Sequence, residues 1–224
     1  MRKKSIVYLS LSLAALLLFT LFTLALTCVD TQNVVYENGA SASIGFYSIN
    51  HAVFSALGAS ELFDTLSDLL MLAAFAVVFA FALIGVYQLF KRKKLFAVDP
   101  AILLLACFYA LVVACYLLFE VLVINYRPIL VDSVLAASYP SSHTLLVSAI
   151  FASAPIALTS LFGCRKLTCA ASVVCLLLAI ASGVLRLLSG MHWLTDVIGA
   201  FLLTAALVLL YAFFLSLCKK EKAE

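Results

Sequence analysis

Residues 167–218 read LTCAASVVCLLLAIASGVLRLLSGMHWLTDVIGAFLLTAALVLLYAFFLSLC, two long apolar runs joined by a short polar turn. A helix needs about 20 mostly apolar residues to cross a membrane. Each run is long enough, so this stretch predicts a pair of antiparallel transmembrane helices. The rest of the chain agrees, because 66% of all residues are hydrophobic and only 11% are charged. That composition is typical of multispanning membrane proteins.

The same length criterion, applied to the whole chain, predicts six transmembrane helices. They are expected at residues 6–27, 69–90, 101–123, 143–162, 167–187 and 192–218. We therefore predict an all-α polytopic protein, a six-helix bundle that forms one domain over residues 1–224. The first apolar run exceeds the roughly 7–15 residues of a signal-peptide core. Because Thr27 also makes a poor cleavage site, we expect this helix to be retained rather than removed as a secretory or lipoprotein leader before Cys28.

Lysine and arginine concentrate in short clusters between or outside these segments. The clusters lie at residues 2–4, 91–94, 165–166 and 219–222. Short basic loops stay in the cytoplasm, and all the clusters fall on one side if every segment spans the membrane. We therefore expect a plasma-membrane protein with both termini in the cytoplasm and outer loops at residues 28–68, 124–142 and 188–191. Near-helical spacing of apolar residues from Val53 to Phe63 also predicts a short surface helix in the first outer loop.

Polar residues collect where the last four predicted helices approach the outer face. The set consists of Arg127, Ser141, Ser142, His143, Arg186, His192 and Asp196. A single charged group near a helix end is usually an interfacial anchor. An ionisable residue inside a membrane segment is by default a functional hypothesis. Because anchoring does not explain so many such groups at one face, we interpret them as one site.

Three features of this set suit a phosphate group. Pro140 followed by two serines is typical of a helix start, where free backbone N–H groups lie at the positive end of the helix dipole. Arg127 and Arg186 can each donate paired hydrogen bonds to a phosphoryl group. His192 and Asp196 are four residues apart, so on a helix the carboxylate would lie one turn from the imidazole and could fix its tautomer. This pattern predicts a histidine nucleophile for phosphoryl transfer.

The spacing of these residues resembles the three-part signature of the type 2 phosphatidic acid phosphatases, the lipid phosphate phosphatase superfamily. The parts are Arg127-Pro128, then Pro140-Ser141-Ser142-His143, then Arg186, His192 and Asp196, with Gly190 and Trp193 inside the last part. The resemblance implies that His192 attacks phosphorus, Asp196 orients it and His143 protonates the leaving oxygen. The groups that it implies for holding the phosphoryl oxygens are Arg127, Arg186 and the amides around Ser141 and Ser142.

The chain departs from that signature at three positions. Ser142 stands where the family usually has glycine, and Leu185 stands where it often has serine. Glu120 replaces a lysine seven residues before Arg127, which exchanges a cation for a carboxylate. If the helix continued, Glu120 and Arg127 would share a face about two turns apart. Our hypothesis is that Glu120 supports the Arg127 guanidinium, and an unchanged turnover in Glu120→Gln with a faster Glu120→Lys would contradict it.

A site at the outer membrane face favours a lipid whose tail stays in the bilayer. Polyprenyl pyrophosphates, phosphatidic acid and phosphatidylglycerol phosphate all remain open as substrates. A lipid phosphotransferase would use the same histidine and pass the phosphate to another acceptor. A non-catalytic lipid-phosphate binder or transporter is the other alternative, and it would bind the lipid without releasing phosphate and tolerate His192→Ala.

Cysteine and histidine usage gives no sign of a metal site. The chain has seven cysteines, but most fall in or beside predicted helices, without CxxC spacing or a neighbouring histidine, as buried free cysteines do. His51 is left outside the site because a lone histidine in a loop is usually a solvated surface residue. We expect no metal, no cofactor and no nucleic-acid partner, and a membrane lipid phosphate as the ligand.

Overall fold

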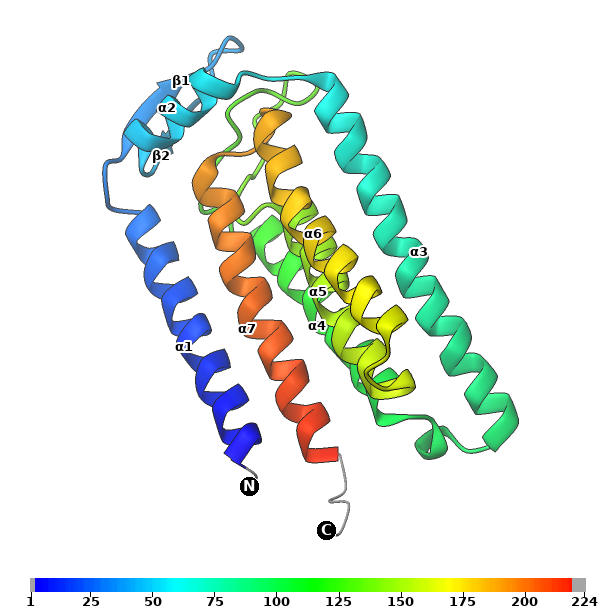
Figure 1. Ribbon diagram of the computed structural model, residues 1–224. Helices are drawn as coiled ribbons and strands as arrows, with labels where there is room; N and C mark the ends of the chain where they lie inside the picture. The colour runs from blue at the N-terminus through cyan, green and yellow to red at the C-terminus, as the bar shows by residue number, and fades with distance from the viewer. Residues whose placement is uncertain (1–2, 219–224) are drawn as a thin grey trace.

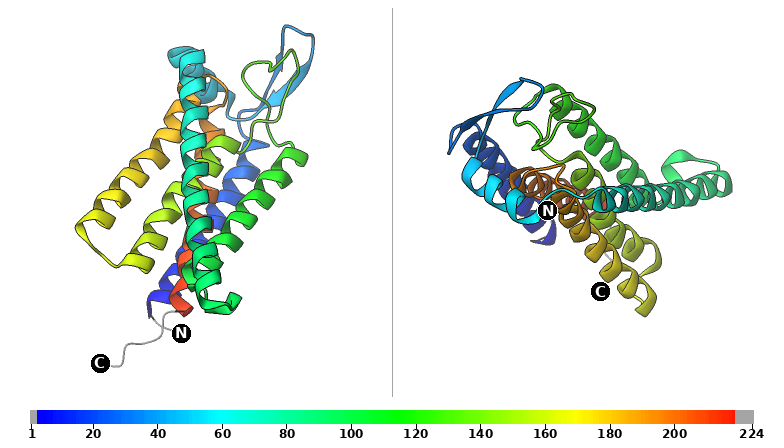
Figure 2. Two further views of the ribbon diagram at one scale, coloured as in Figure 1. Left: turned by 90° about the vertical axis from the view of Figure 1, so that its right-hand side faces the viewer. Right: turned by 90° about the horizontal axis from the view of Figure 1, so that it is seen from above.

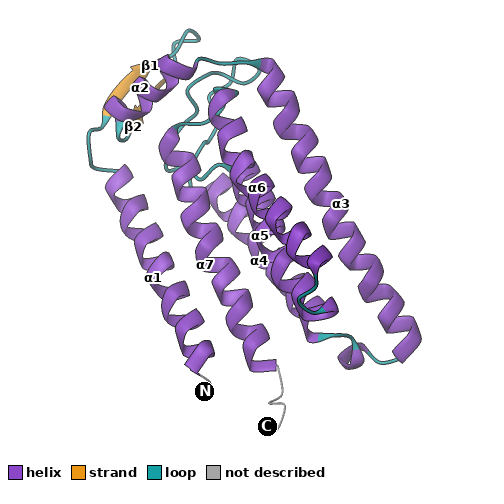
Figure 3. Ribbon diagram, in the orientation of Figure 1, coloured by secondary structure: helices purple, strands orange, loops and turns teal. Residues whose placement is uncertain are grey.

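The computed structural model describes residues 3–218 as a bundle of long helices with a small cap at one end (Figure 1). The elements in chain order are α1 (Lys3–Leu26), β1 (Gln32–Val35), β2 (Ser41–Ile44), α2 (Tyr47–Leu57), α3 (Glu61–Arg92), the 3-10 turn η1 (Leu95–Ala97), α4 (Pro100–Val121), α5 (Ser142–Phe162), α6 (Lys166–Leu188) and α7 (Leu194–Cys218). Strands β1 and β2 pair antiparallel as a hairpin. Figure 3 shows that helix dominates and that the longer loops gather at the capped end.

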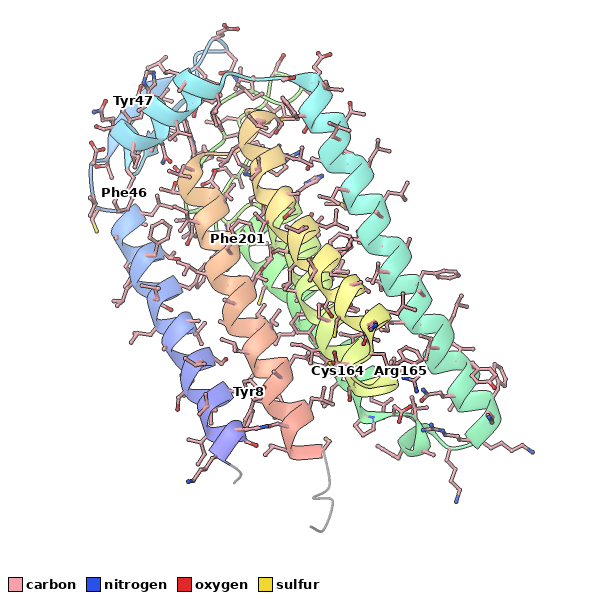
Figure 4. All side chains as sticks on the ribbon, viewed as in Figure 1. Tyr8, Phe46, Tyr47, Cys164, Arg165 and Phe201 are labelled. Atoms are coloured by element: carbon pink, nitrogen blue, oxygen red, sulfur yellow. The ribbon has the colours of Figure 1, made fainter. Side chains whose placement is uncertain are left out.

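Six helices of the described chain are long and apolar enough to cross a membrane, namely α1 and α3 to α7. The prediction of an all-α polytopic bundle is therefore confirmed. Both ends of the described chain lie opposite the cap (Figure 1), and Figure 4 places Arg165 toward that same end, away from Phe46 and Tyr47. The basic residues Arg2, Lys219, Lys220 and Lys222 lie outside the described residues.

Helix α3 begins eight residues earlier than the sequence predicted, at Glu61 instead of residue 69. Glu61 and Asp64 occupy its first turn, where negative side chains stabilise the positive end of the helix dipole. At about 1.5 Å per residue, its 32 residues extend about 48 Å, well beyond a hydrocarbon core of roughly 30 Å. The first part of α3 therefore belongs to the capped end rather than to a loop.

The short helix predicted in the first outer loop is present but shifted. Helix α2 covers Tyr47–Leu57 and ends at Gly58, whose φ is 71°. Leu62 and Phe63, which we expected to continue that helix, belong to α3 instead. The reason is the break at Gly58, since a glycine with a positive φ ends one helix before the acidic first turn begins the next.

Helix α7 lies at the centre of the bundle, between α1 on one side and α4 and α5 on the other (Figures 1 and 2). Leu203, Leu207, Tyr211 and Leu215 of α7 are buried in the main apolar core. Helix α1 also bonds to α7 through polar atoms, because Ser12 Oγ donates to the Ala206 carbonyl at 2.8 Å. Such hydrogen bonds from small polar side chains are a common way for helices to associate in membranes.

The segment between α4 and α5 folds back on itself above the bundle. The Arg127 amide donates to the Ala136 carbonyl at 3.1 Å, and the Ser138 amide donates to the Asn125 carbonyl at 2.9 Å. The Tyr139 hydroxyl, hydrogen-bonded to Thr23 at 2.7 Å, ties the end of this segment to α1. The excursion therefore returns the chain to the start of α5, with Arg127 beside Ala136 and Ala137.

Candidate active site

The start of α5 has the helix cap that the sequence predicted. Ser141 is the N-cap residue, and its side-chain oxygen accepts from the Thr144 amide. The Ser141 amide itself is already bonded to the Asp196 carbonyl at 3.1 Å. Among the described residues, the backbone N–H groups of Ser142 and His143 have no hydrogen-bond acceptor. The amides free to bind an anion are therefore those of Ser142 and His143. The sequence analysis had expected the amides around Ser141 and Ser142.

Arg127 is held over the site by its own loop and by the hairpin. Its Nε donates to the Ala137 carbonyl at 3.2 Å, and its backbone carbonyl accepts from the Tyr36 hydroxyl at 2.8 Å. Burial, helped by the charge of Asp196, raises the pKa of Tyr36 to about 12, so this hydroxyl remains a donor at neutral pH. The two Nη groups of Arg127 form no hydrogen bond to an oxygen among the residues that the structure describes.

The turn between α6 and α7 carries His192 and is fixed from several sides. The Trp193 indole donates to the Tyr126 carbonyl at 2.7 Å. Buried Asn50 of α2 accepts from the Thr195 amide at 3.1 Å and donates to the Thr195 hydroxyl at 2.9 Å. His192 therefore precedes α7, which begins at Leu194, and does not open the helix as predicted. Asn50 was missed by the sequence analysis because its partner lies 145 residues away.

Gly190 lies in the same turn, two residues before His192, and a substitution there would displace the turn. Its φ is 71°, and a Cβ there would lie 2.6 Å from the Ala59 Cβ. We expect Gly190→Ala to lower turnover by about 10²-fold, the effect of roughly 1 Å of misplacement in a catalytic geometry. Gly163→Ala is the matched control, because its φ is 76° and a Cβ there meets nothing within 4 Å. Equal turnover in the two variants, measured beside their thermal unfolding, would contradict this reading.

His192 has a defined tautomer. Its Nδ1 lies 3.0 Å from the Ser138 carbonyl oxygen, and a carbonyl can only accept, so Nδ1 carries the hydrogen. In the neutral ring, Nε2 then holds the lone pair. The Asp196 carboxylate is farther away, with Oδ2 at 3.6 Å from Nδ1, and this oxygen accepts from the Trp193 amide at 2.9 Å. The closest partner that orients the ring is thus the Ser138 carbonyl, with Asp196 stabilising the turn beneath it.

His192 is electrostatically suited to remain neutral. Burial lowers its pKa well below the usual value, and the charges of Arg186 and Arg127 lower the pKa further. A lowered pKa keeps the lone pair on Nε2 as the pH falls, so we expect the His192 ring to titrate below about pH 6.5, the ordinary value. An NMR titration can check this, using the histidine signal that disappears in His192→Gln. A titration midpoint at or above the ordinary value would contradict the prediction that burial and the two arginines lower the pKa of His192.

Two acidic residues of α3 reach the site, and the sequence analysis missed both as site residues. Asp64 Oδ1 accepts from Arg186 Nη1 at 2.6 Å. Asp68 Oδ1 lies 3.0 Å from His143 Nε2. The sequence placed both acids in an outer loop, and only their spacing of four residues, on what proves to be a helix, could have suggested a shared face.

The structure brings Arg127, His143, Arg186 and His192, all predicted from the sequence, into one cluster. The charges of Arg127, Arg186 and His143 all act on His192. Among the described residues, three buried nitrogens of this cluster have no hydrogen-bond partner: His143 Nδ1, Arg186 Nε and His192 Nε2. Among residues 3–218, no three His, Cys, Asp or Glu side chains group into a metal-binding set. The arrangement offers hydrogen-bond donors and one nucleophilic lone pair to an anion.

The structure removes the helical premise of the hypothesis that Glu120 supports Arg127, and the supporting role itself stays a prediction. Helix α4 ends at Val121, so the shared helix face on which that hypothesis rested does not exist. Among the described residues, no ion pair joins Glu120 to Arg127. Glu120 instead lines a small pocket together with His192 and Ser142.

The chain is similar to known proteins in the region that contains this cluster and in its overall fold. The family model of the PAP2 superfamily matches residues 122–218. A crystal structure of a transmembrane PAP2-type phosphatidylglycerolphosphate phosphatase from Bacillus subtilis superposes with a TM-score of 0.66 over 94% of this chain and 98% of that chain, at 19% sequence identity. No curated protein sequence matches the chain. Residues 122–218, which contain the cluster of arginines and histidines, thus match the PAP2 superfamily, and the chain has the fold of a transmembrane PAP2-type phosphatase.

Proposed function

We propose that the protein is a membrane lipid phosphate phosphatase of the PAP2 superfamily, acting through a phosphohistidine on His192. The observation that carries the proposal is the set of three buried nitrogens without a partner among the described residues, His143 Nδ1, Arg186 Nε and His192 Nε2. Buried polar atoms are nearly always hydrogen-bonded. A phosphoryl group between these nitrogens would accept from Arg186, receive the attack of His192 and lie beside His143.

The first chemical step forms the covalent intermediate. The lone pair of His192 Nε2 attacks phosphorus while the bond from phosphorus to the lipid oxygen breaks. His143 gives a proton to that leaving oxygen. Arg127, Arg186 and the free amides of Ser142 and His143 neutralise the charge on the other phosphoryl oxygens, which is the main demand of phosphoryl transfer.

The second step releases inorganic phosphate. A water molecule attacks phosphorus and loses a proton to His143, while the bond between phosphorus and His192 Nε2 breaks. The Ser138 carbonyl keeps the Nδ1 hydrogen of His192 in place at 3.0 Å, so the ring returns with its lone pair on Nε2. These steps use only protein groups, and we propose that turnover requires no metal.

The substrate proposed is a lipid with a phosphomonoester or pyrophosphate head. In support, Tyr116, Phe119 and Glu120 of α4 line the same pocket as His192. The neighbouring Leu117, Leu118 and Val121 are exposed large apolar residues on a helix that can span a membrane. A lipid tail can therefore remain among apolar side chains while its phosphate reaches the site. The basic loops at the opposite end favour an extracytoplasmic site by the positive-inside rule.

The test is phosphate release by purified protein in detergent, with chelator present. Phosphatidic acid, phosphatidylglycerol phosphate and a polyprenyl pyrophosphate form the panel, and His192→Ala controls for contaminating phosphatases. Release that needs His192 and survives the chelator supports the proposal and names the substrate. Binding without any release overturns it in favour of a lipid-phosphate binder. Transfer of phosphate to an added alcohol instead of water identifies a phosphotransferase.

A further inference from the structure

The two α3 carboxylates at the site are one helical turn apart and touch different helices. Asp64 bonds to Arg186 of α6 at 2.6 Å, and Asp68 lies 3.0 Å from His143 of α5. Helix α3 lies wholly outside the part of the chain that matches the PAP2 superfamily, residues 122–218. Helix α3 therefore contributes two side chains to the site from outside the matched region.

The contact with Asp68 gives the two ring nitrogens of His143 different roles. Nε2 lies against the Asp68 carboxylate at 3.0 Å, and an ionised carboxylate only accepts, so Nε2 carries a hydrogen. Nδ1 is buried and has no partner among the described residues. A proton donor must present a nitrogen that is not already bonded, and that nitrogen is Nδ1.

We infer that Asp68 is a positioning residue for the proton donor, holding His143 by Nε2 so that Nδ1 serves the leaving oxygen. The inference rests on the proposed function and deepens it. When the bond from phosphorus to the lipid oxygen breaks, that oxygen takes the proton from Nδ1, and Nε2 keeps its hydrogen toward Asp68. In the second step Nδ1 takes a proton from the attacking water. The Asp68 carboxylate offsets the charge of the ring while both nitrogens hold protons.

The exposure of Asp68 makes the inference testable without unfolding the protein. Its side chain is 64% exposed, against 29% for Asp64. Exposed ion pairs contribute little to stability, so Asp68→Asn should keep the unfolding temperature of the wild type. Any large kinetic effect of this substitution then reflects the chemistry rather than the fold.

The sharpest readout is the leaving group. An alkyl phosphate must receive a proton as its alkoxide leaves, whereas a nitrophenyl phosphate with the same tail leaves as a stable phenolate. The ratio kcat/KM reports the first step alone, up to release of the alcohol. We expect Asp68→Asn to lower kcat/KM about 10-fold or more for the alkyl substrate, a part of the roughly 10²- to 10⁴-fold effect of a general acid. For the nitrophenyl substrate we expect a change within about twofold, because this step then needs no general acid.

Two neighbours on α3 serve as controls. Asp64→Asn should lower kcat/KM for both substrates alike, because Asp64 holds Arg186, which binds the phosphoryl group in either case. Glu61→Gln should change neither, because Glu61 is also on α3 but its side chain has no bond to the site among the described residues. In a His143→Ala background, Asp68→Asn should have no further effect, since coupled residues are not additive.

Three outcomes would overturn the inference. One is an equal loss on both substrates, and another is no loss on either. The third is a lower KM with a higher kcat/KM, which would mean that Asp68 competes with the substrate phosphate. Independently of activity, nitrogen-15 NMR of labelled histidine should place a hydrogen on His143 Nε2, and Asp68→Asn should shift that signal. An unshifted signal overturns the positioning role even if the protein releases no phosphate, whereas an inactive wild type with the shift present contradicts only the proposed function.

Discussion

Protein quenched in alkali during turnover should carry phosphate covalently bound to His192, and His192→Ala should carry none and release phosphate at least about 10³-fold more slowly. The reason is that His192 Nε2 holds the lone pair of the neutral ring, since Nδ1 carries its hydrogen toward the Ser138 carbonyl at 3.0 Å. Labelled lipid phosphate, alkaline quenching and mass spectrometry of the modified peptide measure the intermediate, since phosphohistidine survives base and is lost in acid.

The control for this experiment is the exposed His51 on α2. Its Nδ1 lies 3.5 Å from the Ser55 hydroxyl, and its ring stacks on Tyr47 with centroids 5.2 Å apart. His51→Ala should therefore leave both labelling and turnover unchanged. Label that persists in His192→Ala would show that another group attacks phosphorus, and a fully active His192→Ala without any label would point to direct attack by water.

Arg186→Lys should lower kcat/KM by roughly 10²-fold or more although it conserves the charge, because each hydrogen bond to a charged group contributes about 1.5–3 kcal/mol. The guanidinium uses Nη1 for Asp64 at 2.6 Å, while its buried Nε has no partner among the described residues. One planar group can thus hold a carboxylate and a phosphoryl oxygen at once. A lysine ammonium is a point charge on a flexible stem and cannot reproduce that geometry.

A matched arginine is available at the opposite end of the bundle. Arg92 pairs with Asp99 at 3.3 Å, with side chains 40% and 37% exposed, so Arg92→Lys should keep activity and stability. Steady-state kinetics on the preferred lipid, with unfolding temperatures for both variants, make the comparison. If Arg186→Lys matched the wild type in kcat/KM, charge alone would be sufficient and the forked geometry would have no role.

The transmembrane helices were accessible from the sequence because the bilayer imposes a simple rule. Backbone groups in lipid must be satisfied within the segment, so a span appears as about 20 apolar residues. Helix ends follow weaker signals and were less accurate. Helix α3 begins at Glu61 because acidic residues favour the first turn, which hydropathy does not register.

The residues proposed to bind phosphate were also largely readable from the sequence. Arg127, His143, Arg186 and His192 are charged or titratable groups at predicted helix ends, and the structure brings them together. The partners that orient them were not readable. Ser138 acts through a backbone carbonyl, which every residue possesses and which therefore leaves no mark in a sequence.

Sequence alone determined that this chain is a bundle of membrane helices with charged and titratable residues collected at one end, because hydrophobicity and charge are properties of the residues themselves. Tertiary structure alone decided that Asp64 and Asp68 of α3 meet Arg186 and His143, partners 122 and 75 residues away. It also showed that Glu120 and Arg127 do not share a helix face, because α4 ends between them. Such pairings depend on where helices end and how they pack, and neither property belongs to any single residue.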